Sequence, residues 1–321
     1  MAKSNPHSME HKMQTQFYQA HDGIDLTVHE WHPEDSTPRG IVQIAHGMCE
    51  HSLRYSPVSE FLSTRGWVVI ASDHRGHGKT AANDQKGFIS SHNGWDLLVN
   101  DQKAISERAR EIWPDLPLFL LGHSMGSFVA RDYAARCGEN LAGLLISGTG
   151  AGRFSRLQAT AGALVARMQR AIQGPRHPSR LMTALVFARY NSKISNPRTL
   201  YDWLSRDEGI VDRFIDDEDC GFVCSTSFYQ DLMHGVRRVN SKKTLEATPD
   251  DLPILIFSGD RDPLGLYGKG IVYLNKQFNK LGAKHCNMQL YPGGRHEMLL
   301  EINRDDVFQD ISKWLDVQTN R

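Results

Sequence analysis

The sequence predicts an α/β fold in which helices cover a mostly parallel β-sheet. Short apolar runs rich in β-branched residues recur through the first half of the chain, and all but the first end in Gly, His or Ser. Stretches with helical periodicity separate these runs, which is the alternation expected of a parallel sheet buried on both faces. Two more apolar runs of the same kind return near the C-terminus.

Each predicted element follows from its local pattern. The strands of the first half are DLTVHEW, GIVQIAHG, WVVIASDH, LPLFLLGHS and LAGLLISGTG, and the last two strands are PILIFSGDRDP and NMQLYPGGRH. A helix is predicted from Gly94 to Trp113, because its apolar positions repeat with a period of 3.6 and Pro114 ends it. Helical patterns also run from Phe128 to Cys137 and through the segment DDVFQDISKWLDV.

Residues 151–248 break the alternation. They hold no strong strand pattern, whereas Leu157, Leu164 and Met168 lie at helical spacing. We therefore expect a core formed by residues 1–150 and 249–321, with a helical insertion between its two parts.

The insertion has an uneven distribution of charge. Apart from His177, the ionisable residues from Ala151 to Leu200 are basic, and acidic residues crowd the stretch that follows. We expect the two halves to face each other through surface ion pairs, because charge runs are usually solvated faces. A basic, apolar rim that touches lipid headgroups is the alternative.

Composition limits the classes of function. The 321 residues contain 37 Lys and Arg against 37 Asp and Glu, so net charge provides no attraction for nucleic acid. With 40% hydrophobic and 23% charged residues the chain is globular, which excludes disorder, collagen and a coiled coil.

The cysteines and the N-terminus predict a location. Five cysteines without a tight repeating pattern favour a reduced, intracellular protein. The segment MAKSNPHSMEHKM is polar, and no window approaches the roughly 20 apolar residues that span a bilayer. We therefore expect a soluble, cytoplasmic protein, with peripheral membrane contact through the insertion left open. Its oligomeric state does not follow from the sequence.

The strongest functional signal is Gly122-His123-Ser124-Met125-Gly126, which has the pattern GxSxG. It follows an apolar strand and precedes a helical stretch, as a nucleophile elbow requires. In such a turn the serine backbone is strained, its hydroxyl projects from the sheet edge, and the glycines permit close approach of neighbouring chain. Ser124 is therefore the candidate nucleophile.

A serine nucleophile requires a base and an acid that orients the base. Asp262 follows the strand PILIFSG, and His296 follows the loop after NMQLY. The order Ser, Asp, His is the one expected with a GxSxG elbow. We prefer Asp262 to Asp260, because it lies farther beyond the strand end and can reach the histidine. His285 precedes its strand and is expected at the opposite end of the sheet.

Hydrolysis of an acyl bond also requires donors for the tetrahedral oxyanion. The backbone amide of Met125, directly after the nucleophile, is the first candidate. The second is the amide of Met48 in the loop HGMCEH, where Gly47 allows the chain to orient it.

The segments HGMCEHSLRY, SDHRGHGKT, GHSMGS, SGDRDP and GGRHEM occur in an order that resembles the α/β-hydrolase superfamily, specifically the monoacylglycerol lipases and bacterial lysophospholipases. The similarity extends from about Gln43 to Glu301. It implies an eight-stranded sheet, a helical cap inserted after the sixth strand, a triad of Ser124, Asp262 and His296, and oxyanion amides from Met48 and Met125. Cys49 departs from the pattern HGxGEH, where the second glycine is usual, so we expect an altered loop backbone and sensitivity to thiol reagents.

The chain also contains residue types that bind metals. The two sets are His46, Cys49, Glu50 and His51, and Asp73, His74 and His77. We expect neither to hold a metal, since HEMLLE has Leu300 where the motif HExxH requires histidine, and RGHG fits a loop after a strand. Asp73 and Arg75 are expected to tie that loop to its neighbours. No phosphate loop or dinucleotide fingerprint occurs, so we expect no cofactor.

The predicted function is an ester hydrolase that works through an acyl-enzyme. The apolar insertion favours a small-molecule ester with an alkyl chain, and the resemblance implies monoacylglycerols or lysophospholipids. A short-chain carboxylesterase or thioesterase remains an alternative, as does an amidase or a hydrolase of carbon–carbon bonds. A catalytically silent binding protein of the same fold is the third.

Overall fold

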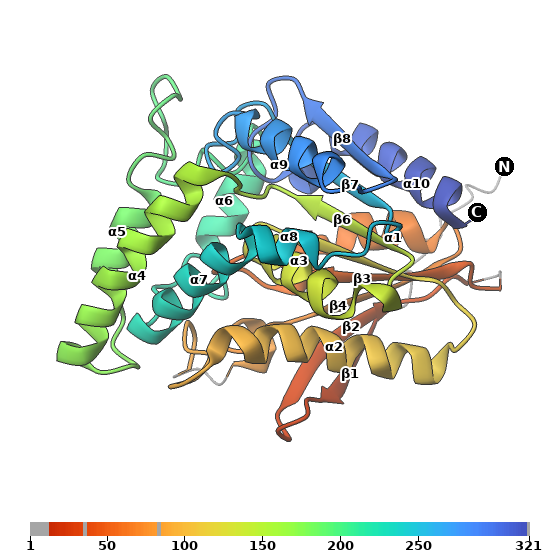
Figure 1. The fold of residues 1–321 in the computed structure, drawn as a ribbon, viewed down its shortest axis with the longest axis horizontal. Coiled ribbons are helices and arrows are strands. Elements are labelled where there is room, and N and C mark those ends of the chain that lie inside the picture. Colours follow the sequence, from red (N-terminus) through yellow and green to blue (C-terminus); the bar gives the residue numbers. More distant parts are fainter. Residues whose placement is uncertain (1–12, 35–36, 82–84, 320–321) are drawn as a thin grey trace, which may run out of the picture.

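The computed structural model describes residues 13–34, 37–81 and 85–319. Its centre is one eight-stranded sheet with the order β1-β2-β4-β3-β5-β6-β7-β8 (Figure 1). The pairs β1–β2 and β2–β4 are antiparallel, and every other pair is parallel. The α/β prediction and the mostly parallel, eight-stranded sheet are therefore confirmed.

Seven of the strands coincide with predicted segments, and one does not. The strands are β1 (Met13–Gln19), β2 (Asp25–Trp31), β3 (Gly40–Ala45), β4 (Trp67–Ser72), β5 (Leu118–His123), β6 (Gly143–Ser147), β7 (Ile254–Gly259) and β8 (Cys286–Tyr291). The pattern did not single out β1, because this edge strand buries only Tyr18 and has no apolar alternation.

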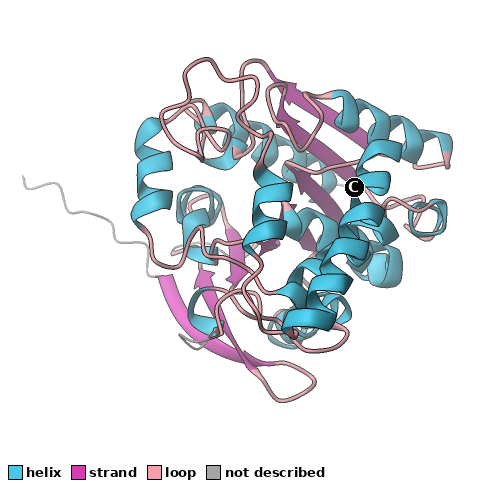
Figure 2. Ribbon diagram, turned by 90° about the vertical axis from the view of Figure 1, so that its left-hand side faces the viewer, coloured by secondary structure: helices cyan, strands magenta, loops and turns pink. Residues whose placement is uncertain are grey.

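Helices cover both faces of the sheet (Figure 2). They are α1 (Ser56–Ser63), α2 (Gly94–Ile112), α3 (Met125–Cys137), α4 (Arg153–Gln173), α5 (Arg180–Phe187), α6 (Glu208–Asp216), α7 (Thr226–Val239), α8 (Lys242–Glu246), α9 (Lys269–Lys280) and α10 (Arg304–Thr319). The helices predicted around Gly94, Phe128 and the C-terminal segment correspond to α2, α3 and α10.

Two apolar cores form because alternate residues of each strand point to opposite faces. Leu120 belongs to the core that packs under α2, α3 and α9. Leu121 belongs to the core under α1 and α10. The central strands β3 to β7 are buried along their whole length, which explains their continuous apolar runs.

The segment between β6 and β7 contains α4 to α8, and α4, α5 and α6 project to one side of the sheet (Figure 1). Among the described side chains, the two charge runs of this segment meet only at Arg198, which pairs with Asp212 at 2.6 Å and Glu208 at 3.9 Å. Other acidic residues pair outside it, as Asp219 does with Lys79 at 2.9 Å. Mutual ion pairing is therefore confirmed at Arg198, and the other described side chains of the two runs make no such pair. None of the described helices is long and apolar enough to cross a membrane.

The parallel strands bring the candidate residues to one edge. Met48 follows β3, Ser124 follows β5, Asp262 follows β7 and His296 follows β8. The carboxyl ends of parallel strands lie at the same edge of a sheet, where open α/β sheets bind their ligands.

Candidate active site

Ser124 occupies a strained turn between β5 and α3. Its φ of 51° and ψ of −116° place a non-glycine residue in a region that L-amino acids rarely adopt. The turn is tight because Gly126 packs against the end of β3, where an added Cβ would lie 2.0 Å from the carbonyl oxygen of Ala45. The local sequence therefore produces the elbow geometry that GxSxG requires.

His296 and Asp262 lie beside each other and are fully buried. Nδ1 of His296 is 3.1 Å from Oδ1 of Asp262. The carboxylate also accepts hydrogen bonds from the Ser258 hydroxyl at 2.8 Å and the Leu264 amide at 2.9 Å. These contacts fix the carboxylate, which can then orient the imidazole.

Each member of this pair favours the charged form of the other. Burial alone disfavours both charges, but the charge and contact of Asp262 outweigh it and raise the pKa of His296. Burial also opposes ionisation of Asp262, yet the imidazole and the hydrogen bonds lower the pKa of that carboxyl. Asp262 is thus held as a carboxylate, and His296 is a stronger base than an ordinary histidine.

The two residues considered less suitable lie elsewhere. Oδ1 of Asp260 accepts a hydrogen bond from the Gly293 amide at 2.8 Å and makes no contact with His296. His285 lies before β8, at the amino end of the strand, where its carbonyl binds the amide of Ile254. Within the described chain, Asp262 is the carboxylate that approaches His296 Nδ1.

Met48 and Met125 present backbone amides near Ser124. Gly47 is so close to the elbow that an added Cβ would lie 3.1 Å from Cβ of Ser124. Met125 opens α3, where the first amides have no partner inside the helix. Among the described residues, neither the Met48 nor the Met125 amide has a hydrogen-bond acceptor in the protein. Both donors are therefore available to a ligand.

Cys49 has a left-handed backbone conformation. Its φ is 57°, which glycine adopts without strain and other residues rarely adopt. The expected alteration of the loop backbone stays a prediction. Sγ of Cys49 lies 3.3 Å from Sγ of Cys224, and both thiols are free and buried. The backbone oxygen of Cys49 also accepts a hydrogen bond from Gly221 of the insertion.

Arg54 connects the loop after β3, which contains Met48, with the loop of His296, a contact that the sequence analysis missed. Its guanidinium binds the carboxylate of Glu297 at 2.6 and 2.7 Å and also contacts Glu50. Glu50 in turn accepts hydrogen bonds from the Gly47 amide and from the Tyr55 hydroxyl. The spacing of Glu50 and Arg54, four residues apart in HGMCEHSLRY, was the available signal.

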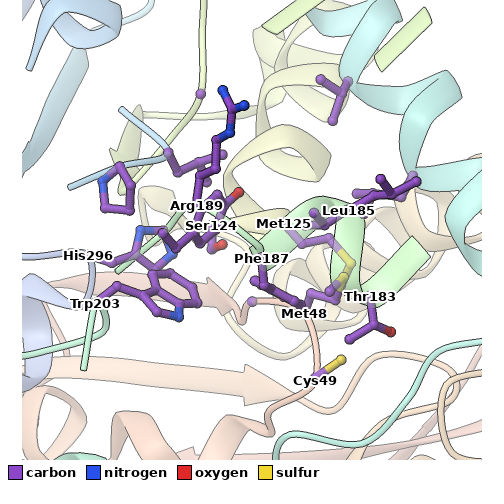
Figure 3. A pocket seen from close by; sticks show the side chains of 18 of the residues that line it. Met48, Cys49, Ser124, Met125, Thr183, Leu185, Phe187, Arg189, Trp203 and His296 are labelled. Atoms are coloured by element: carbon purple, nitrogen blue, oxygen red, sulfur yellow. The ribbon is translucent and has the colours of Figure 1, made fainter. Parts of the chain in front are cut away.

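Ser124 and His296 line a cavity of about 640 Å³ (Figure 3). Its walls come from both the sheet edge and the insertion, and they include the side chains of Met48 and Met125. The apolar lining also includes Phe128, Val165, Met182, Phe187, Leu232 and Val236. Trp203 packs on the His296 ring with the centroids 4.9 Å apart, which places part of the insertion directly against the candidate base.

Two cations of the insertion also line the cavity, and the sequence analysis did not separate them from the basic run. Arg189 and Lys193 are exposed and make no ion pair within the described chain. Nζ of Lys193 lies 3.5 Å from the centre of the Tyr267 ring. The two lining carboxylates, Glu50 and Glu297, both bind Arg54 instead.

The two sets of metal-binding residue types occupy different environments. His46, His74 and His77 are buried with their rings in contact, and burial lowers the pKa of His74 to about 3 and that of His77 to about 4. Asp73 accepts hydrogen bonds from Ser52 and from the Lys79 amide. Arg75 binds Asp101 and Asp22. Asp73 and Arg75 tie their loop to its neighbours, as predicted.

Comparison with known proteins agrees with this architecture. The family model described as serine aminopeptidase, S33, matches residues 36–303. A monoacylglycerol lipase of Mycolicibacterium smegmatis is 24% identical over 91% of this chain and 93% of its own. The structure of a thermostable carboxyl esterase from Bacillus coagulans in complex with glycerol is similar, with 30% identity, a TM-score of 0.88 and coverage of 96% and 99% of the two chains. A lipase solved in an open form has 29% identity, a TM-score of 0.86 and coverage of 97% and 100%. The chain therefore belongs to the serine aminopeptidase S33 family of α/β-hydrolases, in a branch similar to the monoacylglycerol lipases.

Proposed function

We propose that this hydrolase cleaves acyl esters with a long alkyl chain by way of an acyl-enzyme. Ser124 is the nucleophile, His296 the general base and acid, and Asp262 the carboxylate that orients the imidazole. The observation that carries the proposal is that Ser124 and His296 line an apolar cavity next to two unpaired backbone amides. An ester carbonyl at that end can meet the nucleophile and the donors together.

The reaction follows from these positions. Oγ of Ser124 attacks the carbonyl carbon while His296 accepts its proton. The amides of Met48 and Met125 donate to the oxyanion, and each such donor typically contributes about 2.7–4 kcal/mol to transition-state stabilisation. His296 then protonates the leaving alcohol, and water releases the acid by the same sequence. Asp262 remains ionised throughout, because its pKa is lowered.

Residues 151–248 act in this proposal as the cap that binds the acyl chain. The cavity of about 640 Å³ is within the range of roughly 300–1,000 Å³ usual for small-molecule sites, and the cap contributes Val165, Met182 and Leu232 to its lining. Such walls suit a hydrocarbon chain. The name of the monoacylglycerol lipase relative agrees with a single-chain glycerolipid as substrate.

An aminopeptidase activity, which the name of the family suggests, has less support in this cavity. A site for a peptide amino terminus needs an available carboxylate to bind the ammonium group. The lining acids are Glu50 and Glu297, and Arg54 engages both. An ester, which presents no cation, agrees better with this lining.

A lysophospholipid is the second candidate substrate, and the two unpaired cations favour it. Arg189 and Lys193 line the cavity without acidic partners, so they can receive an anionic phosphate. Monoacylglycerol presents no charge to them. A short-chain carboxylesterase remains the alternative, and the name of the structurally similar carboxyl esterase agrees with it as far as the carboxylesterase class.

The outer face of the cap supports transient contact with a membrane, where such substrates reside. Exposed apolar side chains of α4 and α5 outside the cavity lining are Leu157, Leu164, Met168, Ile172 and Leu181. The exposed arginines 156, 167 and 180 accompany them. An apolar helix face with flanking arginines fits the interface of an anionic bilayer. The five cysteines are free, which supports a reducing compartment, and we propose the cytoplasm.

The test compares two substrates and two variants. Fatty acid release from a long-chain monoacylglycerol is measured beside hydrolysis of an acetyl ester, with the wild type and with Ser124→Ala. We expect faster turnover of the long-chain ester, and loss of about 10⁶-fold in kcat in the variant. Ser91→Ala, a serine outside the cavity, is the matched control and should retain activity.

The alternatives predict different results. Activity on the acetyl ester alone would identify a small-ester esterase with the same triad. Turnover that survives in Ser124→Ala would exclude the proposed nucleophile. Hydrolysis of an aminoacyl amide in preference to both esters would restore the aminopeptidase assignment.

A further inference from the structure

A second cluster of reactive side chains lies outside the proposed triad. His51, Asp217 and Cys220 each present one ligand atom, and these three atoms lie within 4.8 Å of one another. Nε2 of His51 and Oδ2 of Asp217 are 2.8 Å apart. Among the described residues, this is the only group of three or more histidine, cysteine or acidic side chains with such spacing.

The cluster joins two segments that are far apart in the sequence. His51 belongs to the loop after β3, directly after Glu50, whereas Asp217 and Cys220 belong to the cap just after α6. The backbone already connects the same two segments, because Cys49 accepts a hydrogen bond from Gly221 at 2.9 Å. This backbone hydrogen bond keeps the two segments together, and it does not depend on the side chains of His51, Asp217 and Cys220.

The donor set is that of a zinc ion. Zinc binds thiolate, imidazole and carboxylate ligands at about 2.0–2.3 Å in a tetrahedron, so its ligand atoms are about 3.3–3.8 Å apart. Movements within about 1 Å would bring the three atoms to that spacing. A thiol with an imidazole selects zinc over calcium or magnesium, which require oxygen ligands.

Charge and access also suit a dication. Arg54 binds the carboxylates of Glu50 and Glu297, and Asp217 contacts His51, so these three carboxylates have only one guanidinium among them when His51 is neutral. The side chains of His51 and Asp217 are 13% and 34% exposed, which leaves a path from solvent. The Cys220 thiol releases its proton to solvent when the metal binds, because the thiolate is the ligand.

We propose that His51 Nε2, Asp217 Oδ2 and Cys220 Sγ form a binding site for one zinc ion, with water as the fourth ligand. The bound ion connects the loop after β3 to the segment just after α6. This inference does not rest on the proposed ester hydrolysis, because the metal can be detected directly.

The test uses the full chain, stripped of metal with a chelator, and Zn²⁺ as the probe. Competition with a chromophoric chelator should give one zinc ion per chain in the wild type. Cys220→Ser and Asp217→Asn should each weaken that affinity at least tenfold. Cys286→Ser, which alters a thiol on β8, is the matched control and should bind as the wild type does.

A spectroscopic measurement distinguishes the loss of one ligand from misfolding of the variant. Co²⁺ in place of zinc should give a thiolate-to-cobalt charge-transfer band in the wild type and in Asp217→Asn, but not in Cys220→Ser. Zinc should raise the melting temperature of the wild type and the control more than that of either site variant. Equal zinc affinity in Cys220→Ser, or no binding by the wild type at micromolar zinc, would overturn the proposal.

Discussion

Arg54 and Glu297 face each other in a two-point contact, with Nη1 2.6 Å from Oε1 and Nη2 2.7 Å from Oε2. Glu297 directly follows His296, and Arg54 also holds Glu50 beside Gly47. One guanidinium therefore links the loop of the proposed base with the loop of the proposed oxyanion donor. The arrangement is buried, since the side chains of Arg54 and Glu297 are 9% and 4% exposed.

Arg54→Gln should therefore destabilise the protein and impair catalysis. Removal of the cation leaves two buried carboxylates without an opposite charge, and breaking such a pair typically costs about 3–5 kcal/mol. The free energy of unfolding in urea measures this loss. Arg39→Gln breaks the exposed pair with Asp316 and should cost less than about 1 kcal/mol. An equal effect of the two substitutions would contradict the linking role.

The pH at which activity falls to half on the acidic side should lie above the usual pKa of a histidine. His296 must be neutral to accept the serine proton, and its pKa is raised above the ordinary value of about 6.5. Activity is therefore expected to fall as the pH drops through that raised pKa. His123, the other histidine of the cavity, has a pKa lowered to about 3 by burial and by His296, so it does not titrate there.

Asp262→Asn supplies the control for this assignment. The amide removes the charge that raises the pKa of His296. The pH at which kcat/KM falls to half should therefore be lower in the variant than in the wild type. kcat should also fall by about 10⁴-fold, the loss typical of a triad without its carboxylate. An unchanged midpoint in a folded variant would show that another group controls the profile.

Inhibition by thiol reagents is expected to depend on the Cys49 side chain. Cys49→Gly should fold and retain activity, because glycine accepts the φ of 57° without strain. A maleimide that reaches Cys49 through the cavity should inhibit the wild type and leave Cys49→Gly active. Labelling of Cys49, verified by mass spectrometry, without loss of activity would remove the prediction. Cys49→Val should lower stability, since a β-branched residue is strained at positive φ.

Arg189 and Lys193 are expected to determine which lipid headgroup the enzyme prefers. Arg189→Gln combined with Lys193→Gln should raise KM for an anionic single-chain phospholipid and leave KM for a monoacylglycerol of the same chain length nearly unchanged. Arg180→Gln removes a cation outside the cavity lining and is the control. Equal changes for both lipids would assign the two cations to general attraction and not to headgroup binding.

Leu164 tests the proposed contact with membranes. This side chain is 61% exposed on α4, so Leu164→Glu should preserve the fold and reduce sedimentation with vesicles of phosphatidylcholine and phosphatidylglycerol. Thr160→Glu, on the same helix, adds the same charge without loss of apolar surface and should have a smaller effect. Hydrolysis of a soluble ester should be similar in both variants. Vesicle binding that does not change in Leu164→Glu would exclude this face.

The sequence by itself determined seven of the eight strands, the elbow and the order of the candidate residues. Each of these depends on neighbours along the chain: GxSxG needs a preceding strand, and a buried strand needs a continuous apolar run. Ser124, Asp262 and His296 could be chosen because parallel strands present their carboxyl ends at one edge. The edge strand β1 was missed because a half-exposed strand has no apolar alternation to detect.

Only the tertiary structure decided which distant side chains meet. The contacts of Cys49 with Cys224, of His51 with Asp217 and of Trp203 with His296 join the core to the cap across more than ninety residues. Periodicity and motif spacing are local, so they cannot reveal such pairs. The charge runs of the cap show the same limit, because their ion-pair partners are set by how α6 and its loops pack against the core. The sequence thus specified the proposed chemistry, and packing specified the cavity around it.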